Sequence, residues 1–308
     1  MFVSCSRWLS GSGGRAIPPN TDKIMLYYKK PIFISVDPLI QFKELHELGT
    51  QNELIGKGGY GEVYKYHHPM LDIDFAVKVF DPVFATEEGK IEGEKRFYRE
   101  ARMLFRLNHI NIVRVYDVGR FHGKPFIKME YISGESLDKL REEKGNLSFV
   151  DAAKAVKQIL EGLQHAHENG IIHRDLKPNN VMVDMKGERW ICKIIDFGVS
   201  AFMETDGYTK LTKTGDRIAG GNYIDPLLQD NPSLRDARSD IYSVSAIMYY
   251  LLCGRAPVGS DIERFLREGN RNLTDSQVKF VLKSLSMDID KRFENCISMR
   301  NAIESMIG

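Results

Sequence analysis

The sequence predicts an α+β protein built from two lobes, a small lobe of strands with one helix and a larger, mostly helical lobe. Strand-like alternation of apolar and polar residues fills most of 52–132, and one helical pattern interrupts it at about 90–107. After Gly134 the apolar spacing is mostly helical. A chain of 308 residues is long enough for such a bilobed domain, and we expect a cleft between the lobes.

Composition and charge exclude several classes of protein. Hydrophobic residues make up 43% of the chain and charged residues 28%, which is typical of a globular protein rather than a disordered tail or a coiled coil. The 43 Lys and Arg residues nearly balance the 42 Asp and Glu residues, so the net charge is only +1. We therefore expect no nucleic-acid partner, because no overall positive field attracts one.

The cysteines and the apolar runs indicate the compartment. The four cysteines, Cys5, Cys192, Cys253 and Cys296, form no CxxC pair and no cluster with histidine at metal-ligand spacing. This pattern predicts a reduced, cytoplasmic protein without disulfides or structural zinc. No apolar run approaches the ~18 residues of a membrane-spanning helix, and the first residues lack the charged leader of a signal peptide. We therefore expect no membrane insertion.

Residues 1–50 are expected to form an N-terminal extension. Glycine, serine and proline dominate 10–20, which predicts a flexible stretch. Asp37 and Pro38 then have the order of a helix cap and a first-turn proline. The apolar residues that follow at helical spacing are Leu39, Phe42, Leu45 and Leu48. A short helix at 38–48 is the result that we expect.

The elements of the two lobes follow in order along the chain. Strand-like runs of the small lobe lie at 54–55, 63–64, 75–79, 112–118 and 125–132. Its helical pattern places Phe97, Ala101 and Leu104 on one face. In the helical lobe, 149–169 keeps its apolar residues on one side, and 239–253 is almost entirely apolar. The second pattern predicts a helix that is buried on all sides.

A glycine cluster lies between the first two strand-like runs. Gly56, Gly58 and Gly61 have the spacing GxGxxG, and Val63 follows after one more residue. Glycines let the backbone approach a polyphosphate and direct amide N–H groups toward it. A dinucleotide-binding fingerprint would lead into a helix, whereas this cluster leads into a strand, so that kind of site is excluded.

Lys78 lies in a strand-like run with apolar neighbours, and Glu100 follows 22 residues later in the helical pattern. Two interpretations of Glu100 remain open. It belongs to a charged helix face, as most charges do, or it pairs with Lys78 and orients the ammonium group toward phosphate oxygens.

The loop at 172–180 carries the most informative group of residues. It contains Asp175, the cation Lys177 two residues later and the amide Asn180 three residues after that, and a proline stiffens it. Asp196 then follows the apolar run 191–195 and precedes Phe197 and Gly198. A strand that delivers an aspartate to a glycine turn suits a hard cation such as Mg²⁺. Four motifs in this order indicate one site.

Together these motifs resemble those of eukaryotic-type protein kinases, and the resemblance extends from about residue 50 to 305. It implies a bilobed kinase fold at 51–308, with a small antiparallel sheet and one helix at about 51–132 and a mostly helical lobe at about 133–308. A lysine two residues after Asp175 is the pattern of serine/threonine kinases. The implied activity is transfer of the γ-phosphoryl group of ATP, with Mg²⁺ or Mn²⁺, to a protein serine or threonine.

The resemblance also implies a role for each site residue. Asp175 is the catalytic base, Lys177 steadies the γ-phosphate, and Lys78 holds the α- and β-phosphates with Glu100 as its partner. Asn180 and Asp196 hold the metal ion. The residues implied to bind ATP are Ile55, Gly56, Lys57, Gly58, Gly59, Tyr60, Gly61, Val63, Ala76, Lys78, Met129, Glu130, Ile132 and Met182.

Within the implied ATP site, Met129 is the gatekeeper, and the Glu130 carbonyl and the Ile132 amide pair with adenine. Three apolar side chains enclose the ring: Val63, Ala76 and Met182. The resemblance further implies an apolar spine that crosses both lobes, formed by Leu104, Val115, His173 and Phe197.

Two positions depart from the family pattern. Leu227, in Asp225-Pro226-Leu227, stands where the family has a glutamate that pairs with a buried arginine resembling Arg292. Arg292 therefore needs another partner, and Asp225 and Asp290 are both candidates because a buried unpaired charge is costly. Gly220 stands where the family has a threonine near the base. The aspartate that anchors the catalytic loop is kept, as Asp240.

These departures favour a divergent member of the family and leave two alternatives open. One is a scaffold that binds nucleotide without transferring phosphate, and the other is a kinase of small molecules. The segment after Asp196 offers sites of autophosphorylation in 205–214. Arg174 resembles an arginine that binds a phosphorylated residue, and at the matching position stands Asp216, with Thr212 and Thr214 as alternatives.

Overall fold

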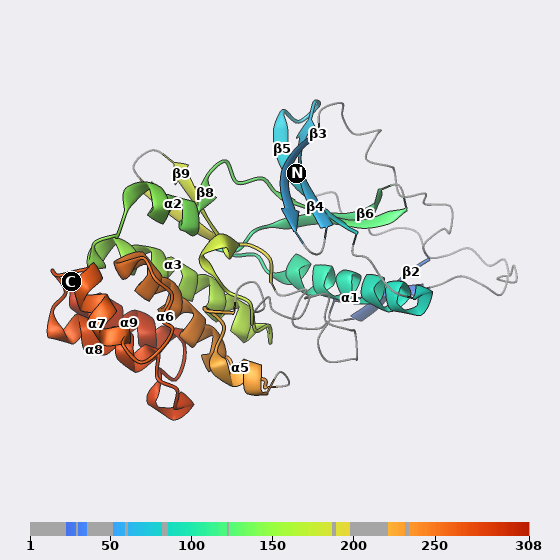
Figure 1. Ribbon diagram of the computed structural model, residues 1–308. Helices are drawn as coiled ribbons and strands as arrows, with labels where there is room; N and C mark the ends of the chain where they lie inside the picture. The colour runs from blue at the N-terminus through green and yellow to red at the C-terminus, as the bar shows by residue number, and fades with distance from the viewer. Residues whose placement is uncertain are drawn as a thin grey trace, which may run out of the picture. The chain divides into compact units, whose positions relative to one another are not determined.

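Figure 1 shows the computed structural model of the chain, which describes residues 23–28, 30–35, 52–58, 61–81, 86–121, 123–186, 189–197, 221–231 and 234–307. The chain divides into two units, residues 1–43 and 44–308. The short helix expected at 38–48 and the flexible stretch expected at 10–20 lie outside the described residues.

The first unit contains an antiparallel hairpin of two strands. β1 (Lys23–Tyr28) pairs with β2 (Lys30–Ser35), so that Lys23 faces Ser35 and Tyr28 faces Lys30. No prediction was made for this stretch. Isoleucine occurs in both strands, tyrosine in β1 and phenylalanine in β2; these residues favour extended backbone, and this composition was the available signal.

The second unit begins with a five-stranded antiparallel sheet of order β3-β4-β5-β7-β6. Its strands are β3 (Asn52–Gly58), β4 (Gly61–His68), β5 (Ile73–Phe80), β6 (Val115–Phe121) and β7 (Lys124–Glu130). Gly58 pairs with Gly61 where β3 turns into β4, and Ala76 on β5 faces Met129 on β7. The small antiparallel sheet expected from the sequence is confirmed.

Helix α1 (Glu87–Arg106) lies alongside this sheet, as Figure 1 shows. The side chain of Thr86 caps its first turn by accepting a hydrogen bond from the backbone nitrogen of Gly89. The apolar face expected from the sequence is buried, and the ring of Phe97 lies 4.8 Å from that of Phe80 on β5. Burial of this face holds the helix on the sheet.

The loop after α1 is attached to the helical lobe. Ile112 forms a parallel bridge with Ile194, in which the Val113 nitrogen donates to the Ile194 carbonyl at 2.9 Å. The side-chain nitrogen of Asn111 donates to the Cys192 carbonyl at 2.8 Å. These bonds connect the C-terminal end of α1 to the strand that leads to Asp196.

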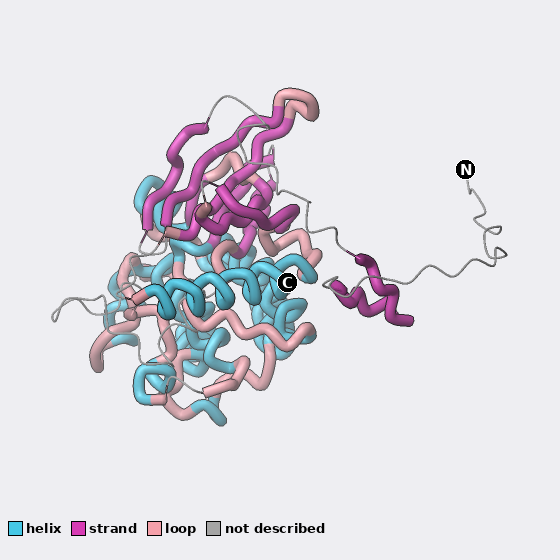
Figure 2. The backbone as a smooth tube through the Cα atoms, turned by 90° about the vertical axis from the view of Figure 1, so that its right-hand side faces the viewer, coloured by secondary structure: helices cyan, strands magenta, loops and turns pink. Residues whose placement is uncertain are grey.

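The helical lobe is built around α6, which is buried along nearly its whole length. Its helices are α2 (Leu137–Lys144), α3 (Phe149–Glu168), α5 (Pro226–Asp230), α6 (Arg238–Cys253), α7 (Ile262–Gly269), α8 (Asp275–Ser284) and α9 (Cys296–Ile307). Figure 2 shows these helices gathered below the strands of the sheet. Both α6 and α9 pack against α3. The buried helix expected at 239–253 is confirmed.

A second, three-stranded sheet belongs to the helical lobe, and α2 and α3 lie between its first and second strands in the chain order. It has the order β10-β9-β8 and consists of β8 (Glu135–Ser136), β9 (Val181–Lys186) and β10 (Arg189–Ile194). Two short 3₁₀ turns are η2 (Pro178–Asn180) and η3 (Ile289–Lys291). The loop before β9 and the loop after β10 carry the residues that the sequence singled out.

A single cluster of buried apolar residues extends through both lobes, from Ala76 and Leu104 to Val156 and Ile247. Cys192, Cys253 and Cys296 are free and buried. Among the described residues, no helix has the length and apolar character needed to cross a membrane.

Candidate active site

The loop at 171–180 connects α3 to β9 and brings three predicted site residues together. The Nζ atom of Lys177 lies 3.1 Å from Oδ2 of Asp175, so the cation and the carboxylate form an ion pair. Asn180 is buried, and its side-chain nitrogen donates to the Asp175 carbonyl oxygen at 2.8 Å. Pro178 starts the 3₁₀ turn that places Asn180 there.

Asp240, in the first turn of α6, anchors this loop through hydrogen bonds to its backbone. Its two carboxylate oxygens accept hydrogen bonds from the backbone nitrogens of His173, at 2.8 Å, and Arg174, at 2.9 Å. His167, at the end of α3, places Nε2 at 2.8 Å from Oδ2. Burial alone would raise the pKa of Asp240, but the hydrogen bond with His167 and the nearby imidazoles hold it below its ordinary value. The carboxylate therefore stays charged and can accept all three donors.

Arg174, whose backbone nitrogen donates to Asp240, takes an unusual backbone conformation. Its φ angle is +67°, in the left-handed region that non-glycine residues seldom adopt. The guanidinium group is mostly buried and donates to the Leu234 carbonyl. Burial and the nearby charge of Arg235 lower the pKa of Arg174.

Asp196 and Lys78 meet across the two lobes. The Nζ atom of Lys78, on β5, lies 2.6 Å from Oδ1 of Asp196, which follows β10. Loss of water around Asp196 would raise its pKa, but the charge of Lys78 lowers it below the ordinary value. The expected partner Glu100 lies on α1, and its side chain is outside the described part of the chain.

The predicted spine is buried in both lobes, since Leu104, Val115, His173 and Phe197 all lie within the core. The rings of His173 and Phe197 are 4.7 Å apart. Burial lowers the pKa of His173, so its imidazole is neutral. One nitrogen then accepts from the Asp175 nitrogen and the other donates to the Ile195 carbonyl, each at 3.4 Å. His173 thus connects the two loops that carry Asp175 and Asp196.

The residues predicted to surround adenine come from both lobes. Three of them, Ala76, Met129 and Ile132, are buried, while Val63 and Met182 are partly buried and pack against the same core. The carboxylate of Glu130 pairs with the buried Lys193 at 3.0 Å, a contact that sequence reasoning did not find. A lysine within an apolar strand was its only signal.

The glycine hairpin contains a backbone position that a residue with a side chain could not occupy. Gly61 has a φ angle of +136°, and a Cβ atom there would lie 1.9 Å from the Val79 carbonyl oxygen. Ile55 on β3 is exposed, and Gly56 follows it at a register shift between the strands. Lys57 pairs with Glu62 at 3.0 Å across the hairpin, and Gly59 and Tyr60 lie outside the described residues.

Arg292 forms an ion pair with Asp225. The guanidinium nitrogens donate to both carboxylate oxygens, at 2.6 and 2.9 Å, and both side chains are fully buried. The other candidate, Asp290, pairs instead with Arg238 at 2.9 Å. Of the two candidates, Asp225 is therefore the partner of Arg292, and its carboxylate stands in for the one that position 227 lacks.

The donor set of these loops suits a divalent cation and a polyphosphate. Asp196 offers a charged carboxylate and Asn180 an amide oxygen, which are oxygen ligands of the kind that Mg²⁺ prefers. Lys78 and Lys177 add two cations beside these groups. The protein kinase domain profile matches residues 50–304, which include every one of these residues.

The chain belongs to the protein kinase family.

This kinase domain is similar to bacterial serine/threonine-protein kinases. It is 37% identical over 211 residues to pkn3 of Myxococcus xanthus, covering 68% of this chain and 38% of that protein. It is 30% identical over 264 residues to PrkC of Bacillus subtilis, covering 82% and 39%. For PknB of Mycobacterium tuberculosis the identity is 31% over 271 residues, covering 83% and 42%. The chain thus spans about two fifths of the length of these curated relatives.

Solved structures confirm the kinase fold. The PknI kinase domain of Mycobacterium tuberculosis matches with a TM-score of 0.63 at 24% identity, over 82% of this chain and 94% of that one. Rad53 1-466 in complex with AMP-PNP matches with a TM-score of 0.63 at 23% identity, over 83% and 64%. The bilobed fold expected from the sequence is therefore correct.

Proposed function

We propose that this kinase domain transfers the γ-phosphoryl group of ATP to a serine or threonine hydroxyl of a protein substrate, with Mg²⁺ or Mn²⁺ as the metal. The observation that supports this most strongly is the 2.6 Å contact between Lys78 and Asp196. It brings the expected phosphate-binding cation of one lobe to the expected metal ligand of the other.

Each charged group has a role in this proposal. Asp175 accepts the proton of the substrate hydroxyl, and Lys177, 3.1 Å from it, neutralises charge that develops on the transferred group. Lys78 binds the α- and β-phosphates, with Glu100 as its partner. Asp196 and Asn180 hold the metal ion, which when bound offsets the negative charge of the phosphates.

The binding of ATP uses backbone and apolar groups. The glycine hairpin from Gly56 to Gly61 covers the phosphates, because its glycines carry no side chains that would block a close approach of the backbone. Adenine lies between Ala76 and Met182, with Met129 behind it. Its polar edge pairs with the Glu130 carbonyl and the Ile132 amide, a pairing that leaves the Glu130 carboxylate free to hold Lys193.

The alternative of a nucleotide-binding scaffold loses one of its two grounds. Leu227 suggested that the usual buried ion pair was missing, yet Arg292 has a complete bidentate partner in Asp225. Only Gly220, which lies outside the described residues, still favours it. The alternative of a small-molecule kinase is disfavoured by the glycine hairpin and by the position of Lys177.

One assay separates these functions. The purified chain is incubated with labelled ATP, MgCl₂ and a generic protein substrate, and phosphoserine and phosphothreonine are identified by mass spectrometry. Asp175→Asn should abolish transfer, whereas Asp261→Asn, an exposed aspartate before α7, should retain it. Incorporation that is absent from the wild type, or unchanged in Asp175→Asn, would contradict the proposal. Peptides from 205–214 would reveal autophosphorylation in the same experiment.

A further inference from the structure

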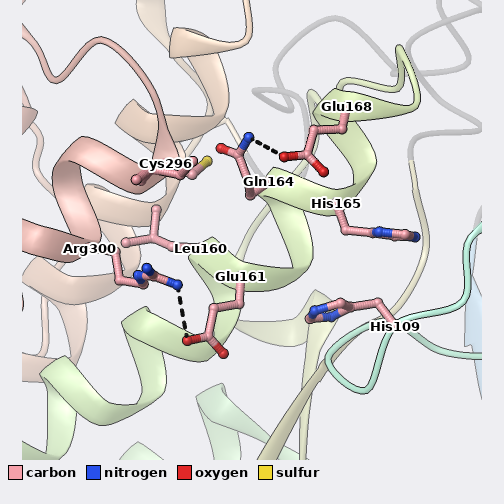
Figure 3. Close-up of a pocket in the computed structure, with 9 residues that line it drawn as sticks. His109, Leu160, Glu161, Gln164, His165, Glu168, Cys296 and Arg300 are labelled. Carbon is pink, nitrogen blue, oxygen red and sulfur yellow. Dashed lines mark hydrogen bonds and ion pairs between the residues drawn. The ribbon is translucent and has the colours of Figure 1, made fainter.

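A hollow of about 340 Å³ opens between α3 and α9 (Figure 3), and none of its lining residues belongs to the predicted site. Its lining includes Gln164 and His165 on α3 and Cys296 and Arg300 on α9. Cys296 lies at the bottom of this hollow, because only 1% of its surface is exposed. The thiol is therefore a buried group that the proposed mechanism does not use.

The start of α9 fixes where this thiol lies. Asn295 caps the helix by accepting from the Ser298 nitrogen at 2.9 Å, and the Ser298 hydroxyl accepts in return from the Asn295 nitrogen at 3.2 Å. Cys296 is consequently the first residue of the helix. Its Sγ atom lies 3.6 Å from Nδ1 of His167 at the end of α3.

The donors and acceptors available on Asp240, His167 and Cys296 decide which group donates in this series of hydrogen bonds. Asp240 is a carboxylate, so it only accepts, and Nε2 of His167 must carry the hydrogen that points to it. Burial raises the pKa of the Cys296 thiol, which keeps the S–H group protonated. In the tautomer that carries its only ring hydrogen on Nε2, Nδ1 is an acceptor, and the thiol faces it as a donor.

We propose that Cys296 is a positioning residue of the catalytic loop: its S–H group donates to Nδ1 of His167 and stabilises the tautomer whose Nε2–H group donates to Asp240. The opposite tautomer would turn a lone pair toward the carboxylate and weaken the anchor. Asp240 in turn accepts the backbone nitrogens of His173 and Arg174, directly before Asp175. A thiol on α9 thus controls the geometry of the proposed base through two hydrogen-bonded side chains.

The first test measures the tautomer itself and does not depend on activity. The chain is labelled with ¹⁵N-histidine, and the His167 signals are assigned from their loss in His167→Gln. Two-bond ¹⁵N–¹H spectra distinguish a protonated Nε2 with an acceptor Nδ1 from the reverse. The first pattern is expected in the wild type, and a protonated Nδ1 with a bare Nε2 would overturn the proposal.

The second test separates hydrogen bonding from packing and rests on the proposed phosphoryl transfer. Cys296→Ala removes the donor, and Cys296→Ser restores one in a side chain of nearly the same size. Cys253→Ala is the matched control, because Cys253 is also buried but donates to the Arg255 carbonyl instead.

In Cys296→Ala we expect kcat to fall about fivefold, as the loss of one net hydrogen bond implies, with an unchanged KM for ATP and a mixed tautomer spectrum. Cys296→Ser should recover both the rate and the spectrum, and Cys253→Ala should alter neither. Equal loss in the Ser and Ala variants, or an unchanged His167 spectrum in the Ala variant, would overturn the proposal. An inactive wild type with the expected tautomer changes would contradict the proposed function alone.

Discussion

Asp225 and Arg292 form a bidentate ion pair in which neither side chain is exposed to solvent. Asp225 also accepts from the Leu227 nitrogen and so caps α5, while Arg292 donates to the Ser286 carbonyl at 2.7 Å. The pair therefore connects the end of the segment before α5 to the last part of the helical lobe. Breaking it leaves one buried charge without compensation.

We predict that Asp225→Asn lowers the free energy of unfolding by about 3–5 kcal/mol, because the Arg292 charge stays buried. Asp290→Asn is the matched control: Asp290 is exposed and pairs with Arg238 at the surface, so its loss should cost less than about 1 kcal/mol. Urea denaturation followed by circular dichroism measures both. Equal costs in the two variants would show that the buried pair contributes nothing special.

Lys78→Met should reduce turnover by about 10²-fold or more, since one preorganised cation beside the phosphates is lost. The fold should remain, because the aliphatic part of methionine fits among the apolar neighbours of Lys78 on β5. The pKa of Asp196 should rise in this variant, because the Lys78 charge that lowers it is gone. Steady-state kinetics and a thermal melt are the measurements, and near-normal turnover would refute the role of Lys78.

The lowered pKa of His173 predicts how the stability of the folded protein depends on pH. Burial holds its folded pKa below the ordinary 6.5. Below that pH the unfolded chain binds a proton that the folded chain does not, so stability falls as the pH falls toward the folded pKa. The slope from this group is at most about 1.4 kcal/mol per pH unit. Urea titrations at several pH values should show a shallower acid slope in His173→Phe than in the wild type; parallel slopes would argue against a neutral, buried His173.

Gly61→Ala should disrupt the glycine hairpin, because its Cβ atom would lie 1.9 Å from the Val79 carbonyl oxygen. We expect a cost above about 2 kcal/mol and a raised KM for ATP. Gly123→Ala provides the comparison: Gly123 also has a positive φ angle, +78°, but nothing lies near its added Cβ. That variant should lose about 1 kcal/mol and keep its KM.

Asp216, which like 205–214 lies outside the described residues, is predicted to pair with Arg174 and to keep the kinase partly active without phosphorylation. A carboxylate carries one charge where a phosphate carries nearly two, so this pair should hold more weakly than a phosphorylated residue. Unphosphorylated protein, verified by intact mass, is assayed beside Asp216→Ala and Thr214→Ala. Loss of activity in Asp216→Ala alone supports the pairing, and loss in Thr214→Ala alone discards it.

Short-range patterns made much of the fold and the site predictable. The residues of the catalytic loop, Asp175, Lys177 and Asn180, lie within six positions, so their spacing alone predicts that they meet. The helix at 239–253 was predictable because its residues are apolar on all sides. In both cases the information lies within a few turns of chain.

Contacts between distant segments were not predictable in the same way. Asp225 and Asp290 were equal candidates for Arg292, and only the contacts of the folded chain, in which Asp225 meets Arg292 and Asp290 meets Arg238, decide between them. His167 and Cys296 lie 129 residues apart, and no local pattern marks either as a neighbour of Asp240. The hairpin of β1 and β2 lacked turn residues of the usual kind, so its composition alone was a weak signal.

The bridge between Ile112 and Ile194 attaches the chain just after α1 to the helical lobe. The helix is 20 residues long and therefore extends about 30 Å from its anchored end. A rotation of about 5° at Leu107 would move the Thr86 end by about 2.5 Å but Glu100, two turns from the anchor, by only about 1 Å. A displacement at the far end of α1 is therefore reduced to less than half where it reaches the backbone of Glu100.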